Sequence, residues 1–234
     1  MQRRTVVFDF DGTLALGRGP LDAYAASLGP LVGEHVVTAC QEAIGRFDAG
    51  GTPFKDAYDA VRVAALEHGA TDDQLSAAYL HSRELLATGA APIHAPDGLG
   101  DFMAELARSA VCVLATNAPE VGIDRALSVL GVTDALAGVH CAVGKPAGLG
   151  PIIAAHLAHG PTLAVGDIWE NDLAPAQLLG ADTALVGVTD PAGTVTMRGA
   201  TLTDLYDDIL TWATQSPTPT PVPLSTGQAP GRAL

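Results

Sequence analysis

Two aspartates separated by one residue follow a short apolar run near the start of the chain. Asp9 and Asp11 come at the end of the segment 5–11, Thr-Val-Val-Phe-Asp-Phe-Asp, and Gly12 follows them. The apolar run predicts a buried strand that carries both carboxylates to its carboxyl-terminal end. In open parallel α/β sheets, ligands bind at this end of the strands. A carboxylate nucleophile beside a carboxylic acid suits phosphoryl or acyl-type transfer.

More polar residues follow later apolar runs of the chain. Thr116 and Asn117 come directly after the run 110–115, where a hydroxyl and backbone amides at a strand–helix turn can hold phosphate oxygens. Lys145, one of only two lysines, follows the run 137–142. Asp167 and Asp172 follow the run 162–165. All of them are therefore expected at one edge of a sheet.

Charge balance at this edge predicts a metal ion. Two like charges about 4 Å apart repel by roughly 4 kcal/mol at an effective dielectric constant near 20. Asp9, Asp11, Asp167 and Asp172 therefore need positive charge if they share one cleft, and Lys145 supplies only one unit of it. Oxygen ligands with few carboxylates suit Mg²⁺, which keeps several waters and recruits substrate phosphate.

The elements that must position these residues alternate along the chain. Strands are predicted over 5–10, 110–115, 137–142, 162–165 and 183–188, and helices over 97–108, 120–130, 149–159 and 171–179. This alternation indicates right-handed βαβ units. We therefore predict an α/β fold whose core is a three-layer, Rossmann-like parallel sheet.

One interval interrupts the alternation and predicts an inserted helical cap. Amphipathic helices are expected over 21–28, 31–47, 53–68 and 71–87, between glycine- and proline-containing hinges at 17–20 and 89–92. The chain is thus divided into a core of residues 1–15 and 96–213, a cap of residues 16–95, and a flexible Pro/Thr-rich tail of residues 214–234. A cap above the sheet edge could close on a substrate and exclude water.

The cap offers four cations whose role the sequence leaves open. Arg18, Arg46, Lys55 and Arg62 could each reach a substrate anion. Solvated charges on helix surfaces are the more common role for such residues.

Composition excludes several classes of function. The formal net charge of −14 over 234 residues disfavours a nucleic-acid partner, which requires a basic face. No apolar stretch approaches the length of a membrane span, and the amino terminus lacks the apolar segment of a signal peptide. The three cysteines are interpreted as reduced thiols. A cytoplasmic protein that does not bind membranes is expected, and its oligomeric state is left open.

The order of the motifs resembles that of the haloacid dehalogenase-like hydrolases. The matching parts are Asp9-Phe10-Asp11-Gly12-Thr13, then Thr116-Asn117, then Lys145-Pro146, and finally Gly166-Asp167 with Asn171-Asp172. The helical insert after the first motif is similar to the cap of phosphoglycolate-phosphatase-like members. The resemblance covers about residues 5–190.

The resemblance implies a role for each residue. Asp9 would attack phosphorus and form an aspartyl-phosphate, and Asp11 would protonate the leaving alkoxide and later activate water. Asp9, the backbone carbonyl of Asp11 and Asp167 would hold Mg²⁺. Asp172 would orient Lys145 or complete the metal shell.

The phosphate-binding residues and the substrate class follow from the same resemblance. Thr116 and Lys145 would neutralise the phosphate oxygens, and Gly12 and Asn117 complete the predicted phosphate site. The implied activity is Mg²⁺-dependent hydrolysis of a small phosphorylated metabolite. A halide leaves without a proton, and dehalogenase members lack the acid at the position of Asp11, so dehalogenation is disfavoured. A sugar phosphomutase using the same Asp pair and a non-catalytic phosphate-ligand-binding protein are the alternatives.

Overall fold

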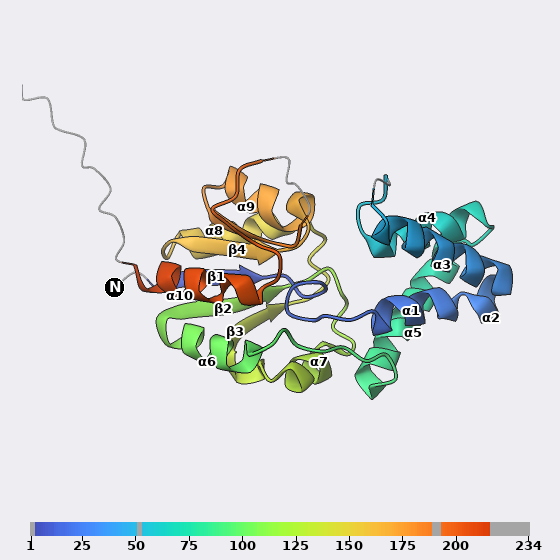
Figure 1. The fold of residues 1–234 in the computed structure, drawn as a ribbon, viewed down its shortest axis with the longest axis horizontal. Helices are drawn as coiled ribbons and strands as arrows, with labels where there is room; N and C mark the ends of the chain where they lie inside the picture. Colours follow the sequence, from blue (N-terminus) through green and yellow to red (C-terminus); the bar gives the residue numbers. More distant parts are fainter. Residues whose placement is uncertain (1–2, 51–52, 189–192, 216–234) are drawn as a thin grey trace, which may run out of the picture.

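A parallel sheet of six strands forms the centre of the computed structural model, which describes residues 3–50, 53–188 and 193–215 (Figure 1). The strand order is β3-β2-β1-β4-β5-β6, and every neighbouring pair is parallel. The strands are β1 Arg4–Phe8, β2 Ala110–Ala115, β3 Leu136–His140, β4 Thr162–Gly166, β5 Asp182–Val186 and β6 Met197–Gly199. The predicted α/β class and parallel sheet are confirmed.

Helices cover both faces of this sheet, because alternate strand residues point to opposite sides. Val6 and Phe8 pack in one apolar cluster with α6 (Leu99–Ser109), α7 (Ile123–Leu130) and α10 (Tyr206–Thr214). Val7 packs in another cluster with α8 (Leu149–Leu157) and α9 (Ala174–Leu178). The result is the predicted three-layer core.

The pairing of the central strands brings the sequence motifs to one edge. Phe8, the last residue of β1, lies opposite Leu114 of β2 and Val165 of β4. Asp9, Thr116 and Asp167 therefore emerge from three adjacent strands at the same carboxyl-terminal edge. The amide of Asp9 still donates to the carbonyl of Val165 at 2.8 Å, which fixes the start of the first loop on the sheet.

Several predicted boundaries are wrong. Strand β1 ends at Phe8 rather than at residue 10, because the amides of Thr13, Leu14 and Ala15 all turn back to the Phe10 carbonyl. The helix predicted over 171–179 is a π-helical turn, Trp169–Leu173, followed by the short α9. The helix predicted over 120–130 begins only at Ile123. Strand β6 and helix α10 were not predicted.

Five helices form a second body beside the sheet edge (Figure 1). They are α1 Gly19–Ser27, α2 Gly29–Val32, α3 Glu34–Asp48, α4 Ala57–Glu67 and α5 Asp72–Thr88. We call them the cap helices, and they share an apolar cluster of their own. The helix predicted over 31–47 is divided at Gly33, whose φ of 134° favours glycine. The two chain segments that join this body to the core run antiparallel at Leu16 and His94, which exchange backbone hydrogen bonds.

Helix α5 is the element that ties the cap helices to the core. Leu75 belongs to the cap cluster, whereas Leu86, farther along α5, belongs to the core cluster. Gly122, just before α7, approaches the α5 backbone so closely that a Cβ atom there would lie 2.7 Å from the carbonyl oxygen of Arg83. The carboxyl-terminal half of α5 is therefore packed directly against the core.

Two predictions lie wholly or partly outside the described residues. Most of the predicted tail, residues 216–234, is not among them, and neither is Thr52, the residue directly before the helix predicted over 53–68. None of the described helices combines the length and apolar character needed to cross a membrane.

Candidate active site

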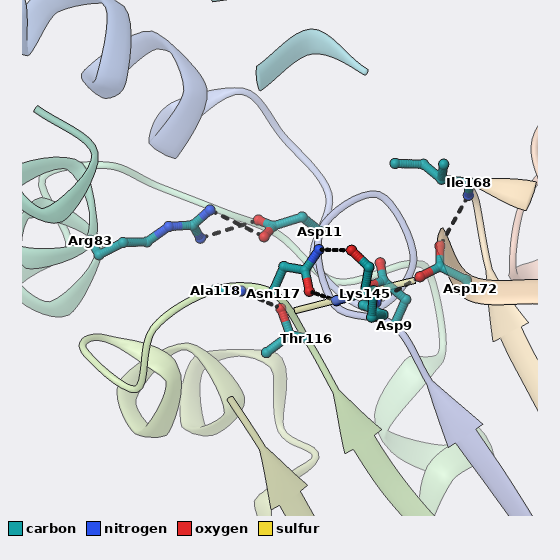
Figure 2. Close-up of polar contacts among 9 residues, drawn as sticks. All are labelled: Asp9, Asp11, Arg83, Thr116, Asn117, Ala118, Lys145, Ile168 and Asp172. Carbon is teal, nitrogen blue, oxygen red and sulfur yellow. Dashed lines mark hydrogen bonds and ion pairs between the residues drawn. The ribbon is translucent and has the colours of Figure 1, made fainter. Parts of the chain in front are cut away.

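Lys145 joins two carboxylates at the edge of the sheet (Figure 2). Its ammonium group donates to Asp9 and, at 2.6 Å, to Asp172. The Lys145 side chain is 3% exposed, so this charge is held almost entirely by the protein. Burial lowers the pKa of Lys145, but Asp9 and Asp172 raise it by more, so its pKa lies above the ordinary value. Lys145 is therefore a permanent cation next to the predicted nucleophile.

A third carboxylate completes a cluster with metal-binding geometry. Asp9, Asp167 and Asp172 each offer an oxygen, and these atoms lie within 4.8 Å of one another. Within the described parts of the chain, the buried Oδ1 of Asp167 has no hydrogen-bond partner. A buried carboxylate oxygen without a partner is costly unless a cation or donor satisfies it. The donor set, all oxygen and mostly anionic, fits Mg²⁺.

The electrostatics of the cluster lead to the same conclusion. Burial raises the pKa of Asp9 to about 7, and the nearby Asp172 charge adds to this effect while Lys145 opposes it. Burial, followed by the charges of Asp9 and Asp172, also raises the pKa of Asp167 well above its ordinary value. Three acids with one lysine are thus short of positive charge, as the sequence predicted.

Asp172 has both of its oxygens occupied within the protein. One accepts from Lys145, and the other accepts from the amide of Ile168 at 3.1 Å. The π-helical turn that carries Asp172 packs its side chain against Gly166, where a Cβ atom would collide with it. Of the two roles that the resemblance implied, this geometry serves the orientation of Lys145, although an oxygen of Asp172 also lies within the metal cluster.

Asn117 holds the loop of Lys145 instead of pointing its amide into the site. Its Oδ1 accepts from the amide of Lys145 at 2.6 Å, and its Nδ2 donates to the Lys145 carbonyl at 3.4 Å. The neighbouring Thr116 is buried, and its hydroxyl oxygen accepts from the amide of Ala118 at 3.0 Å. The Thr116 hydroxyl keeps its proton for donation to an anion.

Gly12 is required by the geometry of the first loop. Its φ of 86° favours glycine, and a Cβ atom would collide with the carboxylate of Asp167. The predicted residues Asp9, Gly12, Thr116, Asn117 and Lys145 all line a single cavity.

Asp11 leaves the cluster and pairs with a residue that the sequence analysis missed. Its two oxygens accept from Nη1 and Nη2 of Arg83 on α5, at 3.3 and 3.2 Å. Figure 2 shows the Asp11 carboxylate turned toward Arg83, while the Asp9 carboxylate meets Lys145 on the other side. The Asp11 side chain lies outside the three-carboxylate cluster of the described chain, so only its backbone carbonyl remains a predicted metal ligand.

Arg83 is the largest fully buried side chain among the described residues. The rings of Tyr58 and Tyr79 lie 5.3 and 4.9 Å from its guanidinium carbon, and Nη2 also donates to the Tyr58 hydroxyl at 3.2 Å. Burial lowers the pKa of Arg83, but Asp11, Tyr58 and Tyr79 together raise it by more, so the guanidinium stays charged. Leu75, Tyr79, Arg83 and Leu86 recur at helical spacing, which is the one sequence signal that marked Arg83 as inward-facing.

The cavity that contains these groups has a volume of about 790 Å³ and reaches from the sheet edge into the cap helices. Its core half holds the charged cluster. Its cap half is lined by apolar and aromatic side chains (Leu21, Tyr24, Phe47, Tyr58, Leu75 and Tyr79) and by charged ones (Lys55, Asp56, Asp59, Arg62, Asp72 and Arg83). This volume is typical of small-molecule sites.

Two of the four cap cations considered from sequence line this cavity. Lys55 and Arg62 do so, and Arg62 pairs with Asp59 at 2.9 Å. Arg18 pairs with Asp48 on the surface, and Arg46 is exposed on α3; neither lines the cavity. Arg18 and Arg46 are therefore surface charges in the structure.

Comparisons with known proteins identify solved structures with a similar fold. No family model matches the sequence, and no curated protein matches it either. Among solved structures, the HAD-hydrolase YfnB from Bacillus subtilis, bound to magnesium, shares 20% identity over 89% of this chain and 99% of its own, with a TM-score of 0.61. A HAD phosphatase from Thermococcus onnurineus shares 16% identity over 88% and 97%, with a TM-score of 0.56.

A dehalogenase has a comparable likeness. The 2-haloacid dehalogenase from Pseudomonas syringae shares 20% identity over 90% of this chain and 99% of its own, with a TM-score of 0.55. The chain therefore has the fold of the haloacid dehalogenase-like hydrolases, as the motifs implied. Because both chemistries occur among these neighbours, the reaction must be argued from the site.

Proposed function

We propose that this protein is a Mg²⁺-dependent phosphomonoesterase that acts on a small phosphorylated metabolite through an aspartyl-phosphate. The observation that carries the proposal is the division of charge at the sheet edge. Asp9 is held by Lys145 beside the carboxylate of Asp167, while a second acid, Asp11, faces the cap half of the cavity. Phosphoryl transfer requires positioning and charge neutralisation of this kind more than elaborate covalent chemistry.

Asp9 is the proposed nucleophile. Lys145 holds its carboxylate in place and, together with the hydroxyl of Thr116, can donate to the phosphate oxygens. Asp9, Asp167 and the backbone carbonyl of Asp11 would hold Mg²⁺, with Asp172 beside them. When bound, this ion supplies positive charge that offsets the charge of the carboxylates and of the phosphate.

Asp11 favours phosphoester chemistry over dehalogenation. An alkoxide leaving group needs a proton, whereas a halide leaves without one, so an acid that protonates the leaving group has a function only in the first case. Asp11 would give its proton to the departing oxygen and, as the carboxylate, would then take a proton from the water that cleaves the aspartyl-phosphate.

The cap half of the cavity bears on the substrate class. Its tyrosine, phenylalanine and leucine side chains can pack against a ring or apolar part of the leaving alcohol, and its charged side chains can contact polar groups of that alcohol. Together with the cavity volume of about 790 Å³, this supports a small phosphorylated molecule as the substrate.

The test is phosphate release from a panel of phosphorylated metabolites and a generic aryl phosphate, with Mg²⁺ and with a chelator. We expect Mg²⁺-dependent release by the native protein and a loss of at least about a thousandfold in Asp9→Asn, because the nucleophile is removed. Positional isomers are followed in the same samples, since isomer formation without free phosphate would indicate a mutase. Absence of phosphate release from every ester, or full activity in Asp9→Asn, would refute the proposal.

A further inference from the structure

Arg83 is a buried cation that has no role in the reaction proposed above. It lies on α5, and its side chain is 1% exposed, whereas its partner Asp11 is 30% exposed. Within the described residues, its Nε has no hydrogen-bond partner, so hydrogen bonds do not fully offset the desolvation cost of burying the guanidinium. Such a costly buried guanidinium is expected to have a function at the ionic contact that the described residues give it, the carboxylate of Asp11.

The contact is geometrically specific. Nη1 and Nη2 each reach a different oxygen of Asp11, at 3.3 and 3.2 Å, which fixes the plane of the carboxylate as well as its position. The rings of Tyr58 and Tyr79 flank the guanidinium and restrict its rotamers. Arg83 therefore acts as a rigid support for Asp11.

The support is also fixed relative to the sheet. At Arg83, the backbone of α5 packs against Gly122, and Leu86, one turn later, lies in the core cluster. Because the carboxyl-terminal half of α5 is docked on the core, Arg83 keeps a defined position relative to Asp9 and Lys145. A lysine or arginine elsewhere on the cap helices would lack this anchoring.

The direction in which Asp11 is held matches the reaction proposed above. In phosphoryl transfer the attacking and leaving oxygens lie roughly in line, so the leaving oxygen departs on the side of phosphorus opposite Asp9. We propose that Arg83 is a positioning residue that holds the Asp11 carboxyl group on this cap-facing side, within reach of the leaving oxygen. This inference rests on the proposed phosphomonoesterase function.

The proton balance of the step is simple. As the bond from phosphorus to the leaving oxygen breaks, the proton of the Asp11 carboxyl moves to that oxygen and the alcohol departs. Asp11 is left as a carboxylate paired with Arg83, and in the second half-reaction it takes a proton from water as the oxygen of that water attacks phosphorus. The bond from phosphorus to Asp9 then breaks and releases phosphate.

A matched pair of esters separates positioning of the acid from every other effect. The leaving group of 4-nitrophenyl phosphate departs with little need of a proton, whereas 4-nitrobenzyl phosphate, with the same ring and one more methylene, releases an alkoxide that needs one. The comparison uses kcat/KM, which reports the departure of the leaving group, because kcat also includes cleavage of the aspartyl-phosphate, a step that both esters share and that also uses Asp11. We expect Arg83→Met to lower kcat/KM on the benzyl ester by about tenfold to a hundredfold and on the phenyl ester by less than about threefold.

A double-mutant cycle with Asp11→Asn tests whether Arg83 acts through Asp11. In the Asp11→Asn background, Arg83→Met should cause no further loss on the benzyl ester, because there is no acid left to position. Arg83→Lys keeps the charge but loses the two-point contact, so an intermediate loss of kcat/KM confined to the benzyl ester is expected. This variant also carries the test if Arg83→Met does not fold.

Arg46→Met is the matched control, because it removes one arginine charge from an exposed position of the cap helices outside the cavity. It should leave both esters unaffected. Equal losses of kcat/KM on both esters in Arg83→Met and Arg83→Lys, or additive losses with Asp11→Asn, would overturn the inference while leaving the phosphatase intact. A native protein that releases phosphate from neither of these esters nor from any metabolite of the panel described above would instead refute the proposed function itself.

Discussion

The substitution Asp167→Asn should stabilise the metal-free protein while abolishing its response to Mg²⁺. The ligand oxygens of Asp9, Asp167 and Asp172 lie within 4.8 Å of one another. Two unit charges at that separation repel by about 3.5 kcal/mol at an effective dielectric constant near 20. Lys145 contacts Asp9 and Asp172, but among the described contacts it donates no hydrogen bond to Asp167. Asp167 is therefore the least compensated of the three.

The expected gain is smaller than the full repulsion, because the raised pKa of Asp9 and of Asp167 lets the folded protein take up protons. We expect Asp167→Asn to raise the free energy of unfolding of the metal-free protein by about 2 kcal/mol, or about 4–8 °C in Tm for a chain of this size. The native protein should gain about 2.7 kcal/mol at a Mg²⁺ concentration one hundred times Kd, and the variant should gain almost nothing.

Thermal unfolding followed by tryptophan fluorescence, with chelator and with Mg²⁺, measures both effects in one experiment. Asp182→Asn is the control, because it removes an acid from the same sheet at a position outside the cavity. It should leave the Mg²⁺ response unchanged. A lower Tm for metal-free Asp167→Asn than for the native protein, or an undiminished Mg²⁺ response in this variant, would refute the reasoning.

Three further predictions concern the same site. Burial raises the pKa of Asp9 from 3.8 to about 7, so the stability of the metal-free protein should fall as pH rises between these values. Mg²⁺ competes with those protons, and its shift in Tm should be larger at about pH 8 than at about pH 5; equal shifts would contradict this. Asn117→Ala removes both side-chain bonds to the Lys145 backbone and should lower kcat about tenfold on phenyl and benzyl esters alike, with little change in Tm. A loss confined to the benzyl ester would argue against this. Lys145→Met leaves Asp9 and Asp172 without their shared cation and should lower the free energy of unfolding by about 3–5 kcal/mol without metal, measured by urea denaturation; unchanged stability would show that the pair needs no cation.

The core of the fold was predictable because its signals are local. Buried parallel strands are continuous apolar runs, and the polar residues that follow them mark the ligand-binding edge. The start of α5 was equally readable: the helix predicted from residue 71 begins at Asp72, and Thr71 caps it in a capping box with Gln74. The start of α4 was not, because the helix predicted from residue 53 begins only at Ala57, where Asp56 caps it by accepting from the amide of Asp59 at 2.7 Å.

The pairing of Arg83 with Asp11 depends on tertiary structure, and no local pattern contains it. The two residues are 72 positions apart in the chain. Helical spacing shows that Arg83 faces inward, but its partner is set by how α5 docks on the core at Gly122. The interruption of the helix after β4 also depends on tertiary contacts. Its π-helical turn, Trp169–Leu173, places Asp172 where its two oxygens accept from Lys145 and from the amide of Ile168. Propensity alone favours a continuous helix there.

The most direct test of the central claim is to trap the phosphorylated protein. Native protein mixed with a turnover substrate and Mg²⁺ is quenched in acid, and the mass of the peptide containing Asp9 is determined. We predict an added phosphoryl group on Asp9 that disappears when substrate is exhausted and is absent in Asp9→Asn. Rapid release of phosphate with no phosphoryl group on Asp9 at any time, or with the group on another residue, would contradict the account.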